Sequence, residues 1–322
     1  MFTKARVVLF LVLLSLCVPA VVPADDFTDE LSEALEEISA DHYQPITAAF
    51  GNFTFEYTDL AGSFARYLQD RLTQAIGRVS RFSLFVHDAL DNLDPAFSEI
   101  YGDLFSEEGV EAVLQAQYFD EGNRVRVTLR VDSLMTATMI GTTEVFVPKS
   151  AVPSGVDLAP ADVEFAMQRQ QELTDLVANE SEDLVVRATL NKGSSAVYRD
   201  GERMTVSVYT NRDAYIKVYH IDVDGNTTLI FPNMFEADNF VPAQTIIDIP
   251  DRSHPFEFAL HEPFGTEFIK VMASQTQFDD IEESFSGLGR ASERVLTRGL
   301  SVRRLESGDV AETLVRYSIV ER

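Results

Sequence analysis

The sequence predicts an α+β protein of two domains, a mixed-sheet α/β sandwich at residues 43–150 and an antiparallel β-sandwich at residues 184–322. Two observations lead to this fold class. The first segment alternates long helical stripes with short strand patterns, which is typical of a mixed sheet covered by helices. The second segment carries short apolar strands at regular spacing, separated by turns that contain Gly, Pro and Asn, as β-sandwiches do.

A leader precedes both domains. Two basic residues charge its start, an apolar run spans residues 7–18, and the small residue Ala24 stands before two aspartates. This order is the pattern of a cleaved signal peptide, and the run is shorter than the ~20 residues that span a bilayer. We therefore expect a signal peptide at residues 1–24, with Ala20 as the weaker cleavage position, and an exported mature chain without a transmembrane segment.

Cys17 is the only cysteine of the chain. The segment Leu14–Cys17 resembles a lipoprotein box, in which the cysteine becomes the lipidated first residue, although Leu16 stands where a small residue is usual. A lipid anchor at Cys17 is thus the alternative to a free periplasmic or secreted protein. Cleavage after Ala24 leaves no thiol, which excludes disulfides, thiolate metal sites and a cysteine nucleophile.

The charge balance is strongly acidic. The chain has 52 Asp and Glu residues against 26 Lys and Arg residues, which gives a formal net charge of −26. Such a protein is repelled by nucleic acids and by anionic lipid surfaces. We therefore expect neither nucleic acid nor an anionic lipid surface as its partner.

The elements of the first domain follow from periodicity. Residues 25–42 predict a short acidic helix or a frayed arm. A strand is expected at residues 46–56 and a helix at residues 58–79, with Thr58 as its N-cap. The chain then predicts a strand at 82–87, a helix at 95–104 and strands at 112–119, 124–132 and 139–147. The order is β-α-β-α-β-β-β, a mixed sheet with helices on one face.

Residues 151–183 are expected to join the domains. Pro and Gly residues between positions 150 and 160 predict a linker, and residues 160–179 predict a polar connector helix. The second domain predicts strands at 184–190, 203–210, 214–223, 227–231, 245–249, 256–260, 266–274 and 311–320. Asp224-Gly225 has the composition of a two-residue hairpin turn between two of these strands.

The second domain resembles a known family. The matching segments are Tyr198-Arg199-Asp200-Gly201-Glu202, Tyr215-Ile216-Lys217-Val218-Tyr219, Asp222-Val223-Asp224-Gly225, Leu229-Ile230-Phe231-Pro232-Asn233, Ile249-Pro250 and Gly265-Thr266-Glu267-Phe268-Ile269-Lys270. In their order and spacing these segments resemble the bacterial domain of unknown function 4384, over roughly residues 184–275. The resemblance implies an accessory or recognition module, and it implies no enzymatic activity.

The first domain resembles a second group of proteins at the level of pattern. Its strand at Ile46, its helix from Leu60 to Ile76, its hairpin at 112–132 and its strand at 139–148 carry the resemblance. They resemble the α/β module shared by the CsgG family, the flagellar FlgO-like proteins and the TolB amino-terminal domain. The sequence contains no amphipathic hairpins of the kind that CsgG inserts into a membrane, so pore formation is not implied.

No catalytic, metal or cofactor site is predicted. The five histidines lack the spacing of metal ligands, and the turn at Asp222, Asp224 and Asn226 lacks the glycine and the glutamate of a calcium loop. Ser286-Gly287-Leu288-Gly289 lacks the leading glycine of a hydrolase elbow. We therefore expect a protein that is not an enzyme.

Two surface features are candidate binding sites. Arg124, Arg126 and Arg130 alternate with apolar residues, so they share one strand face that suits an acidic partner. The alternative is a solvated strand face. Tyr215, Tyr219 and Asn233, with Phe231, Pro232 and Phe235 nearby, form an aromatic and polar set that suits sugars or proteins. The alternative is that they belong to the sandwich core and a structural turn.

Together these observations predict an exported, non-enzymatic accessory protein of the bacterial cell envelope. It is expected in the periplasm or at the outer membrane, where it acts through protein–protein contacts in the assembly or maintenance of a surface structure. The alternative is a module that binds glycan or peptidoglycan, and an envelope hydrolase is the least favoured class. The sequence gives neither the partner nor the oligomeric state.

Overall fold

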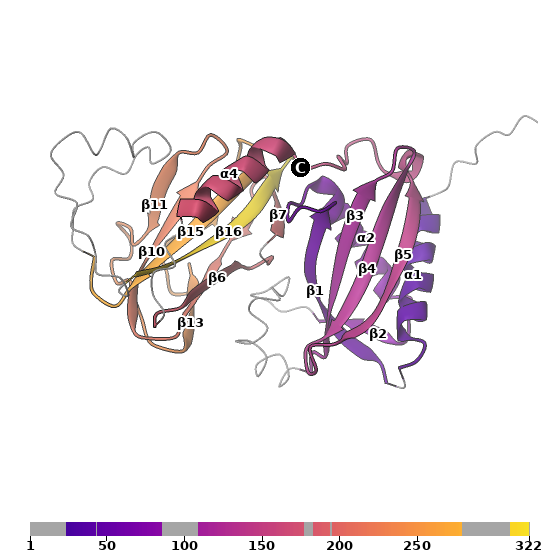
Figure 1. The fold of residues 1–322 in the computed structure, drawn as a ribbon, viewed down its shortest axis with the longest axis horizontal. Coiled ribbons are helices and arrows are strands. Elements are labelled where there is room, and N and C mark those ends of the chain that lie inside the picture. Colours follow the sequence, from indigo (N-terminus) through magenta and orange to yellow (C-terminus); the bar gives the residue numbers. More distant parts are fainter. Residues whose placement is uncertain are drawn as a thin grey trace, which may run out of the picture.

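A computed structural model describes residues 24–42, 44–85, 109–176, 183–193, 195–278 and 310–321. The expected α+β fold of two domains is confirmed (Figure 1). Several predicted features lie outside the described residues: the leader up to position 23 with Cys17, the helix at 95–104, His87 and the glycine-rich segment at 286–289.

The first domain is built on a mixed five-stranded sheet in the order β2-β1-β3-β4-β5. β1 lies parallel to both β2 and β3, whereas β3, β4 and β5 pair antiparallel. Its strands are β1 (Ile46–Phe55), β2 (Phe82–Leu84), β3 (Ala112–Asp120), β4 (Arg124–Ser133) and β5 (Met139–Pro148). The predicted mixed sheet is therefore present.

Two helices cover one face of this sheet. α1 (Ala24–Ser39) packs against α2 (Ser63–Ile76) and β5, and α2 also contacts β1 and β2 (Figure 1). Apolar residues recur at helical spacing in both helices, so each buries one stripe against the sheet. The buried stripe of α1 consists of Phe27, Leu31, Ala34, Leu35 and Ile38. The acidic segment predicted at residues 25–42 is therefore a helix of the first core over most of its length.

The N-cap expected for α2 is wrong. The helix begins at Ser63 with Gly62 in the cap position, and Gly62 offers no side-chain cap. Thr58 instead donates its hydroxyl to the carbonyl of Phe55 at 2.5 Å and accepts from the N–H of Leu60 at 3.2 Å. A threonine that bonds its own neighbours in this way stabilises a turn and competes with helix initiation.

The connector between the domains lies against the first domain for part of its length. The short 3₁₀ helix η2 (Lys149–Ala151) follows β5, and Asp157 is hydrogen-bonded through its backbone to Ser63 at the start of α2. α4 (Val163–Leu176) then runs beside the large sheet of the second domain (Figure 1). The guanidinium of Arg169 on α4 lies directly over Gly225, where a Cβ atom would meet it at 2.2 Å.

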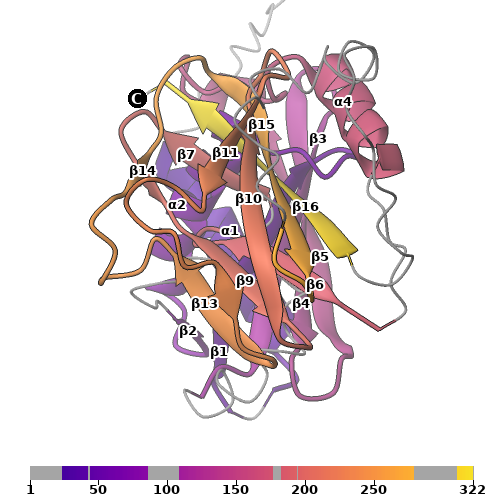
Figure 2. The ribbon, with the colours of Figure 1, turned by 90° about the vertical axis from the view of Figure 1, so that its left-hand side faces the viewer.

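The second domain contains a large sheet in the order β11-β10-β15-β16-β7, with β12 paired to β10 (Figure 2). A three-stranded sheet, β13-β9-β6, packs against it, and β14 pairs with β8. The strands are β6 (Val186–Leu190), β7 (Ser195–Arg199), β8 (Arg203–Met204), β9 (Val206–Thr210), β10 (Ala214–Ile221), β11 (Thr227–Phe231), β12 (Phe240–Val241), β13 (Thr245–Ile249), β14 (Phe258–Ala259), β15 (Gly265–Ser274) and β16 (Val310–Val320).

One pair departs from the predicted antiparallel pattern. β7 runs parallel to β16, with Ser195 opposite Arg316 and Arg199 opposite Val320. Two neighbouring parallel strands must be joined by a long crossover connection. More than a hundred residues of the domain connect β7 to β16. The other strand pairs of the second domain are antiparallel.

Apolar contacts join the two domains. Ala49 and Val113, on the sheet face that the helices leave open, pack against Tyr209 of β9 and Ile246 of β13. Val197 of β7 is buried within the first core. Burial of apolar side chains from both halves stabilises the junction, because it removes them from water.

The helices of the described segments are all too short or too polar to cross a bilayer.

The structure predicts a specific role for Gly51 on β1. A Cβ atom at this position would lie 2.6 Å from Cγ1 of Val113 and 2.8 Å from Cγ of Gln115. Val113 is β-branched and belongs to the junction, so it has little freedom to move. We expect Gly51→Ala to lower the free energy of unfolding by about 1–3 kcal/mol, measured by denaturant titration.

The matched control is Gly155→Ala, because nothing lies within 4 Å of a Cβ atom there. Its effect should stay within about 0.5 kcal/mol. Equal losses for the two variants would contradict the steric reason given for Gly51.

Candidate functional site

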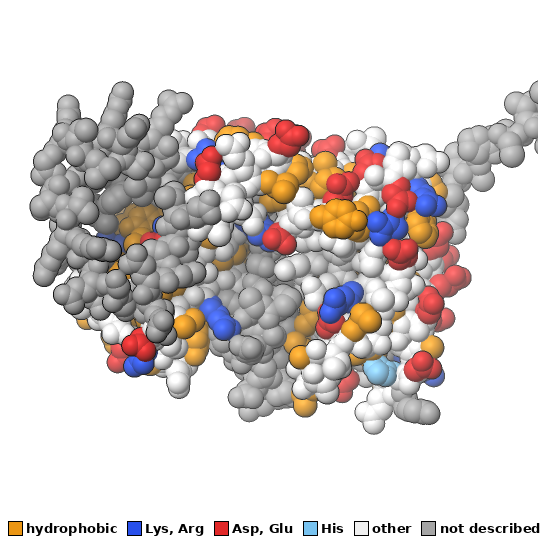
Figure 3. Space-filling view, viewed as in Figure 1, with side chains coloured by type: hydrophobic (Ala, Val, Ile, Leu, Met, Phe, Trp, Pro, Cys, Tyr) orange, Lys and Arg blue, Asp and Glu red, His pale blue; other side chains and the backbone are white. Residues whose placement is uncertain are grey.

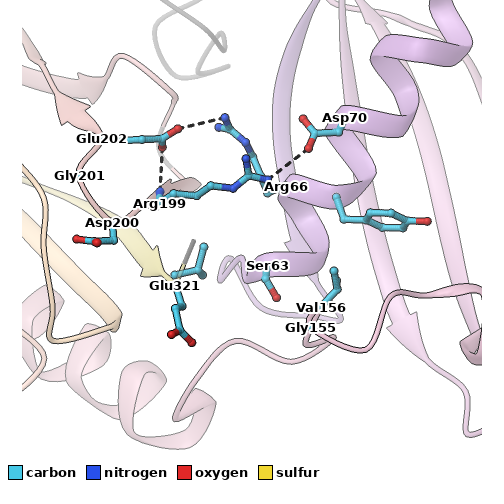
Figure 4. A pocket seen from close by; sticks show the side chains of 12 residues that line it. Ser63, Arg66, Asp70, Gly155, Val156, Arg199, Asp200, Gly201, Glu202 and Glu321 are labelled. Atoms are coloured by element: carbon cyan, nitrogen blue, oxygen red, sulfur yellow. Dashed lines mark hydrogen bonds and ion pairs between the residues drawn. The ribbon is translucent and has the colours of Figure 1, made fainter.

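A cleft of about 610 Å³ opens where the two domains meet (Figure 4). The first domain contributes the start of α2 and the connector around residue 155. The second contributes the turn between β7 and β8 and the end of β16. Its lining residues are Ser63, Arg66, Tyr67, Asp70, Gly155, Val156, Arg199, Asp200, Gly201, Glu202, Val320 and Glu321.

Two ion pairs cross the cleft in opposite directions. Arg66 of α2 reaches Glu202 in the second domain at 3.3 Å, and Arg199 of the second domain reaches Asp70 on α2 at 3.5 Å (Figure 4). Each domain thus supplies one guanidinium and one carboxylate. The first pair is the more buried, so its Coulomb attraction is less weakened by water.

Glu202 is the centre of this arrangement. Its carboxylate accepts hydrogen bonds from Nζ of Lys192 at 2.5 Å and from the backbone N–H of Arg199 at 2.9 Å, besides the contact with Arg66. Burial by itself would raise the pKa of Glu202. The hydrogen bonds from Lys192 and Arg199, with the charges of Lys192 and Arg66, more than offset it and lower the pKa below its ordinary value.

A loop of the first domain docks beside the cleft. The backbone carbonyl of Asp59 accepts from the hydroxyl of Ser195 at 2.9 Å and from Nε of Arg316 at 2.7 Å. The Asp59 carboxylate also pairs with Arg316 at 3.3 Å. The loop between β1 and α2 is therefore held directly on β7 and β16, which fixes the walls of the cleft relative to each other.

The structure places the predicted arginines on one face of β4. Arg124 and Arg126 both pair with Glu121, at 2.9 and 2.8 Å, and Arg130 pairs with Asp132 at 2.8 Å. Arg126 also pairs with Glu144, at 3.0 Å. Figure 3 shows basic and acidic side chains interspersed on the visible face of the first domain. Each of the three guanidinium groups therefore has a carboxylate beside it.

The predicted aromatic and polar set is distributed over β10 and the loop after β11. Tyr215 packs edge-on against Phe240, with ring centroids 5.4 Å apart, and Tyr219 is only 4% exposed. Asn233 donates to the carbonyl of Ile230 and accepts from the N–H of Phe235, both at 2.9 Å. Asn233 thereby shapes the loop that follows Phe231.

This loop carries exposed apolar side chains. Phe235 is 58% exposed and stacks on Phe256, with ring centroids 6.2 Å apart. Phe256 also packs against Phe258, with ring centroids 5.5 Å apart. The three phenylalanines form an aromatic row at the surface of the second domain. Phe256 and Phe258 come from a segment more than twenty residues beyond Phe235, so the sequence alone gave no reason to group them.

The turn before the aromatic row is held by Asp251. Its carboxylate accepts from the hydroxyl and the N–H of Ser253, both at 2.7 Å, and contacts Nδ1 of His254 at 2.8 Å. These hydrogen bonds, the Ser253 hydroxyl first among them, lower the pKa of Asp251 to about 2. The His254 ring then lies edge-on to Phe256, so the turn positions the middle ring of the row.

A buried carboxylate lies within the second sandwich. Glu267 on β15 is 2% exposed and contacts Nε2 of His220 at 2.8 Å and the hydroxyl of Tyr317 at 2.6 Å. Burial, and then the charge of Glu267, raises the pKa of the Tyr317 hydroxyl well above its ordinary value. The described part of the chain holds no group of three or more His, Cys, Asp or Glu side chains arranged to bind a metal ion.

The cleft residues were not among the candidate residues predicted from the sequence. The apolar stripe of α2 predicts the helix, but Arg66 lies on its polar side. Its partner Glu202 is 136 positions further along the sequence. The segment from Tyr198 to Glu202 was recognised only as part of a family resemblance. A contact between positions so far apart leaves no local signal in a single sequence.

The fold and this site define a two-domain α+β protein whose halves share a charged cleft. Residues 197–277 match the family model described as "Domain of unknown function (DUF4384)", so the resemblance predicted for the second half is confirmed. The match begins at Val197 on β7, within the second domain. Among curated proteins, none matches the chain.

Some solved structures are similar to parts of the chain. The LpoB C-terminal domain from Salmonella enterica aligns with a TM-score of 0.28 and 12% identity, over 38% of this chain and 98% of that one. Escherichia coli LpoB aligns with a TM-score of 0.28 and 10% identity, over 46% and 80% of the two chains. TolB from Acinetobacter baumannii aligns with a TM-score of 0.22 and 11% identity, over 76% and 71%.

The crossed pairs predict a measurable role for Glu202. We expect Glu202→Gln to lower the free energy of unfolding by about 1.5–3 kcal/mol, because hydrogen bonds to a charged group contribute about that much. The folded-state pKa of Glu202 lies below its ordinary value of 4.5. The contribution is therefore complete above pH ~4.5 and is lost as the pH falls through the lower folded-state pKa, so the two proteins should converge in acid.

The control is Glu257→Gln, whose carboxylate pairs with Arg203 at 2.7 Å on the exposed surface. Exposed pairs contribute about 0–1 kcal/mol, so this variant should lose little. Denaturant titrations at several pH values make the comparison. A loss at Glu202 no larger than at Glu257, or one that is constant with pH, would refute the role assigned to Glu202.

Proposed function

We propose that this protein is an exported, non-enzymatic accessory protein of the cell envelope that acts through protein–protein contacts. Its role is the assembly or maintenance of a surface structure. The observation that carries this proposal is the cleft built by both domains around Glu202, Arg66, Arg199 and Asp70. Export is inferred from the leader at residues 1–24, which has the charge and length of a signal peptide.

The contacts between the domains support a binding role, because they hold the cleft in a preformed shape. The Asp59 loop and the crossed ion pairs hold both walls before any partner arrives. A surface that is already ordered loses less conformational entropy when it binds, so more of the contact energy is available for affinity. A mixture of charged and apolar lining is also ordinary for protein interfaces.

A second candidate function is recognition of glycan or peptidoglycan. The aromatic row of Phe235, Phe256 and Phe258 favours it, since exposed aromatic rings supply large contact surfaces at little cost in side-chain entropy. The row lies on the second domain, as does the aromatic and polar set predicted from the sequence.

In-cell photo-crosslinking tests the proposal. A photoreactive residue placed at Val156 or at Glu321 lies in the cleft, whereas one at Glu36 lies on the exposed side of α1. We expect the two cleft positions to capture the same envelope protein and position 36 not to capture it. Capture of nothing from the cleft, combined with retention on purified cell wall that Phe235→Ala abolishes, would replace the first function with the second.

Intact-mass analysis of the exported protein tests the leader. We expect the mature chain to begin at Asp25 and to carry no lipid, because cleavage after Ala24 removes Cys17. A chain that begins at Cys17 with an attached lipid would establish the anchored alternative. A chain that keeps residues 1–24 would remove the basis for export.

A further inference from the structure

We propose that the cleft receives an extended segment of a protein partner that carries Lys or Arg side chains. This inference rests on the proposed function, because it names the chemistry of the partner that the cleft would contact. Three properties of the cleft carry it: its surplus of carboxylates, its apolar floor and its length along α2.

The lining of the cleft contains more carboxylates than guanidinium groups. Arg66 and Arg199 are the two cations, and both are paired across the junction with Glu202 and Asp70. Asp200 and Glu321 are the two further acids of the lining. Nζ of Lys192, which also contacts Glu202 at 2.5 Å, is a third cation beside the lining. Four carboxylates therefore face three cations, which leaves a small negative surplus that repels an anionic ligand and attracts a cationic one.

Asp200 and Glu321 differ in exposure and in their partners. Asp200 contacts Nδ1 of His261 at 3.0 Å, and its side chain is 40% exposed. Glu321 is exposed at the end of β16 and has no ion-pair partner among the described residues. Figure 4 shows Asp200 and Glu321 on the same side of the cleft as the end of β16. Glu321 is placed to contact a cation without breaking the pairs that hold the domains. The Asp200 carboxylate points away from the arginines and lies at the rim of the cleft, beside His261 (Figure 4).

The floor beside these acids is apolar. Val156 of the connector and Val320 of β16 both line the cleft and both are half-buried. Lysine and arginine have an apolar stem and a charged head, and such side chains lay the stem on apolar surface while the head reaches a charge. A free small cation would use the carboxylates but not the valines, so the combination favours a side chain of a polypeptide.

The length of the cleft fits an extended segment. Ser63 and Asp70 both line it, and seven residues of helix span about 10 Å. An extended chain advances about 3.3 Å per residue, so roughly three residues fit along this distance. The electrostatic field of the whole chain also favours a cationic segment, because the chain has 52 acidic and only 26 basic residues.

The test uses N-acetylated, C-amidated pentalysine as the probe and pentaglutamate as its counterpart. Both are titrated into the ¹⁵N-labelled mature protein, and the amide shifts of Gly155, Gly201 and Glu321 are followed. We expect pentalysine to shift these amides to saturation and pentaglutamate to leave them in place. The affinity should fall as salt is added, because exposed charge contacts are screened.

Two double variants make the result specific. Asp200→Asn with Glu321→Gln removes the two acids and should weaken pentalysine binding about tenfold, as expected for the loss of two charge contacts. Glu33→Gln with Glu36→Gln removes the same charge from the exposed side of α1 and should change the affinity less than about twofold. All four positions are solvent-accessible, and the circular dichroism of both variants should match that of the parent.

Equal weakening by the two double variants, or shifts spread over the surface and absent from the cleft, would overturn the inference. The proposed function fails by a different result, which is that crosslinkers in the cleft capture no protein. Captured partners whose crosslinked segments contain no Lys or Arg would leave the proposed function standing and would overturn this inference alone.

Discussion

The cleft depends on the hydrogen bonds and ion pairs of the Glu202 carboxylate. Lys192 and the backbone N–H of Arg199 donate to it from its own domain, and Arg66 donates to it from the other domain. A carboxylate with this many donors remains ionised despite its burial, because the hydrogen bonds and nearby positive charges more than offset desolvation. Its removal would release Arg66 from the second domain and would leave Arg199 and Asp70 as the remaining crossed pair.

Ion pairs and apolar contacts contribute to the junction in different ways. Ala49 and Val113 meet Tyr209 and Ile246, and Val197 enters the first core. Burial of such side chains is non-directional, so by itself it permits sliding. The paired charges and the hydrogen bonds of the Asp59 loop are directional, and they select one arrangement.

Local patterns in the sequence predicted much of the fold. The apolar stripe of α2 predicts a helix, but a threonine before the stripe also predicts an N-cap at Thr58. Thr58 instead forms a turn with Phe55, and the helix begins at Ser63. The alternation of apolar residues in β4 predicts that Arg124 and Arg126 share one face of the strand, as they do. It does not predict their partners Glu121 and Glu144, and Glu144 lies on the neighbouring strand β5. β7 was not predicted, since five residues acquire strand character by pairing with β16 more than a hundred positions away.

The junction holds both domains in one fixed arrangement and so preforms the cleft. Residual dipolar couplings test this arrangement directly, when the protein without residues 1–23 is weakly aligned and the couplings of each domain are fitted separately. We expect one common alignment tensor for both domains, and the same tensor at raised salt, because apolar contacts also hold the junction. Two tensors of different magnitude or orientation would show that the domains move independently and that the cleft is not preformed.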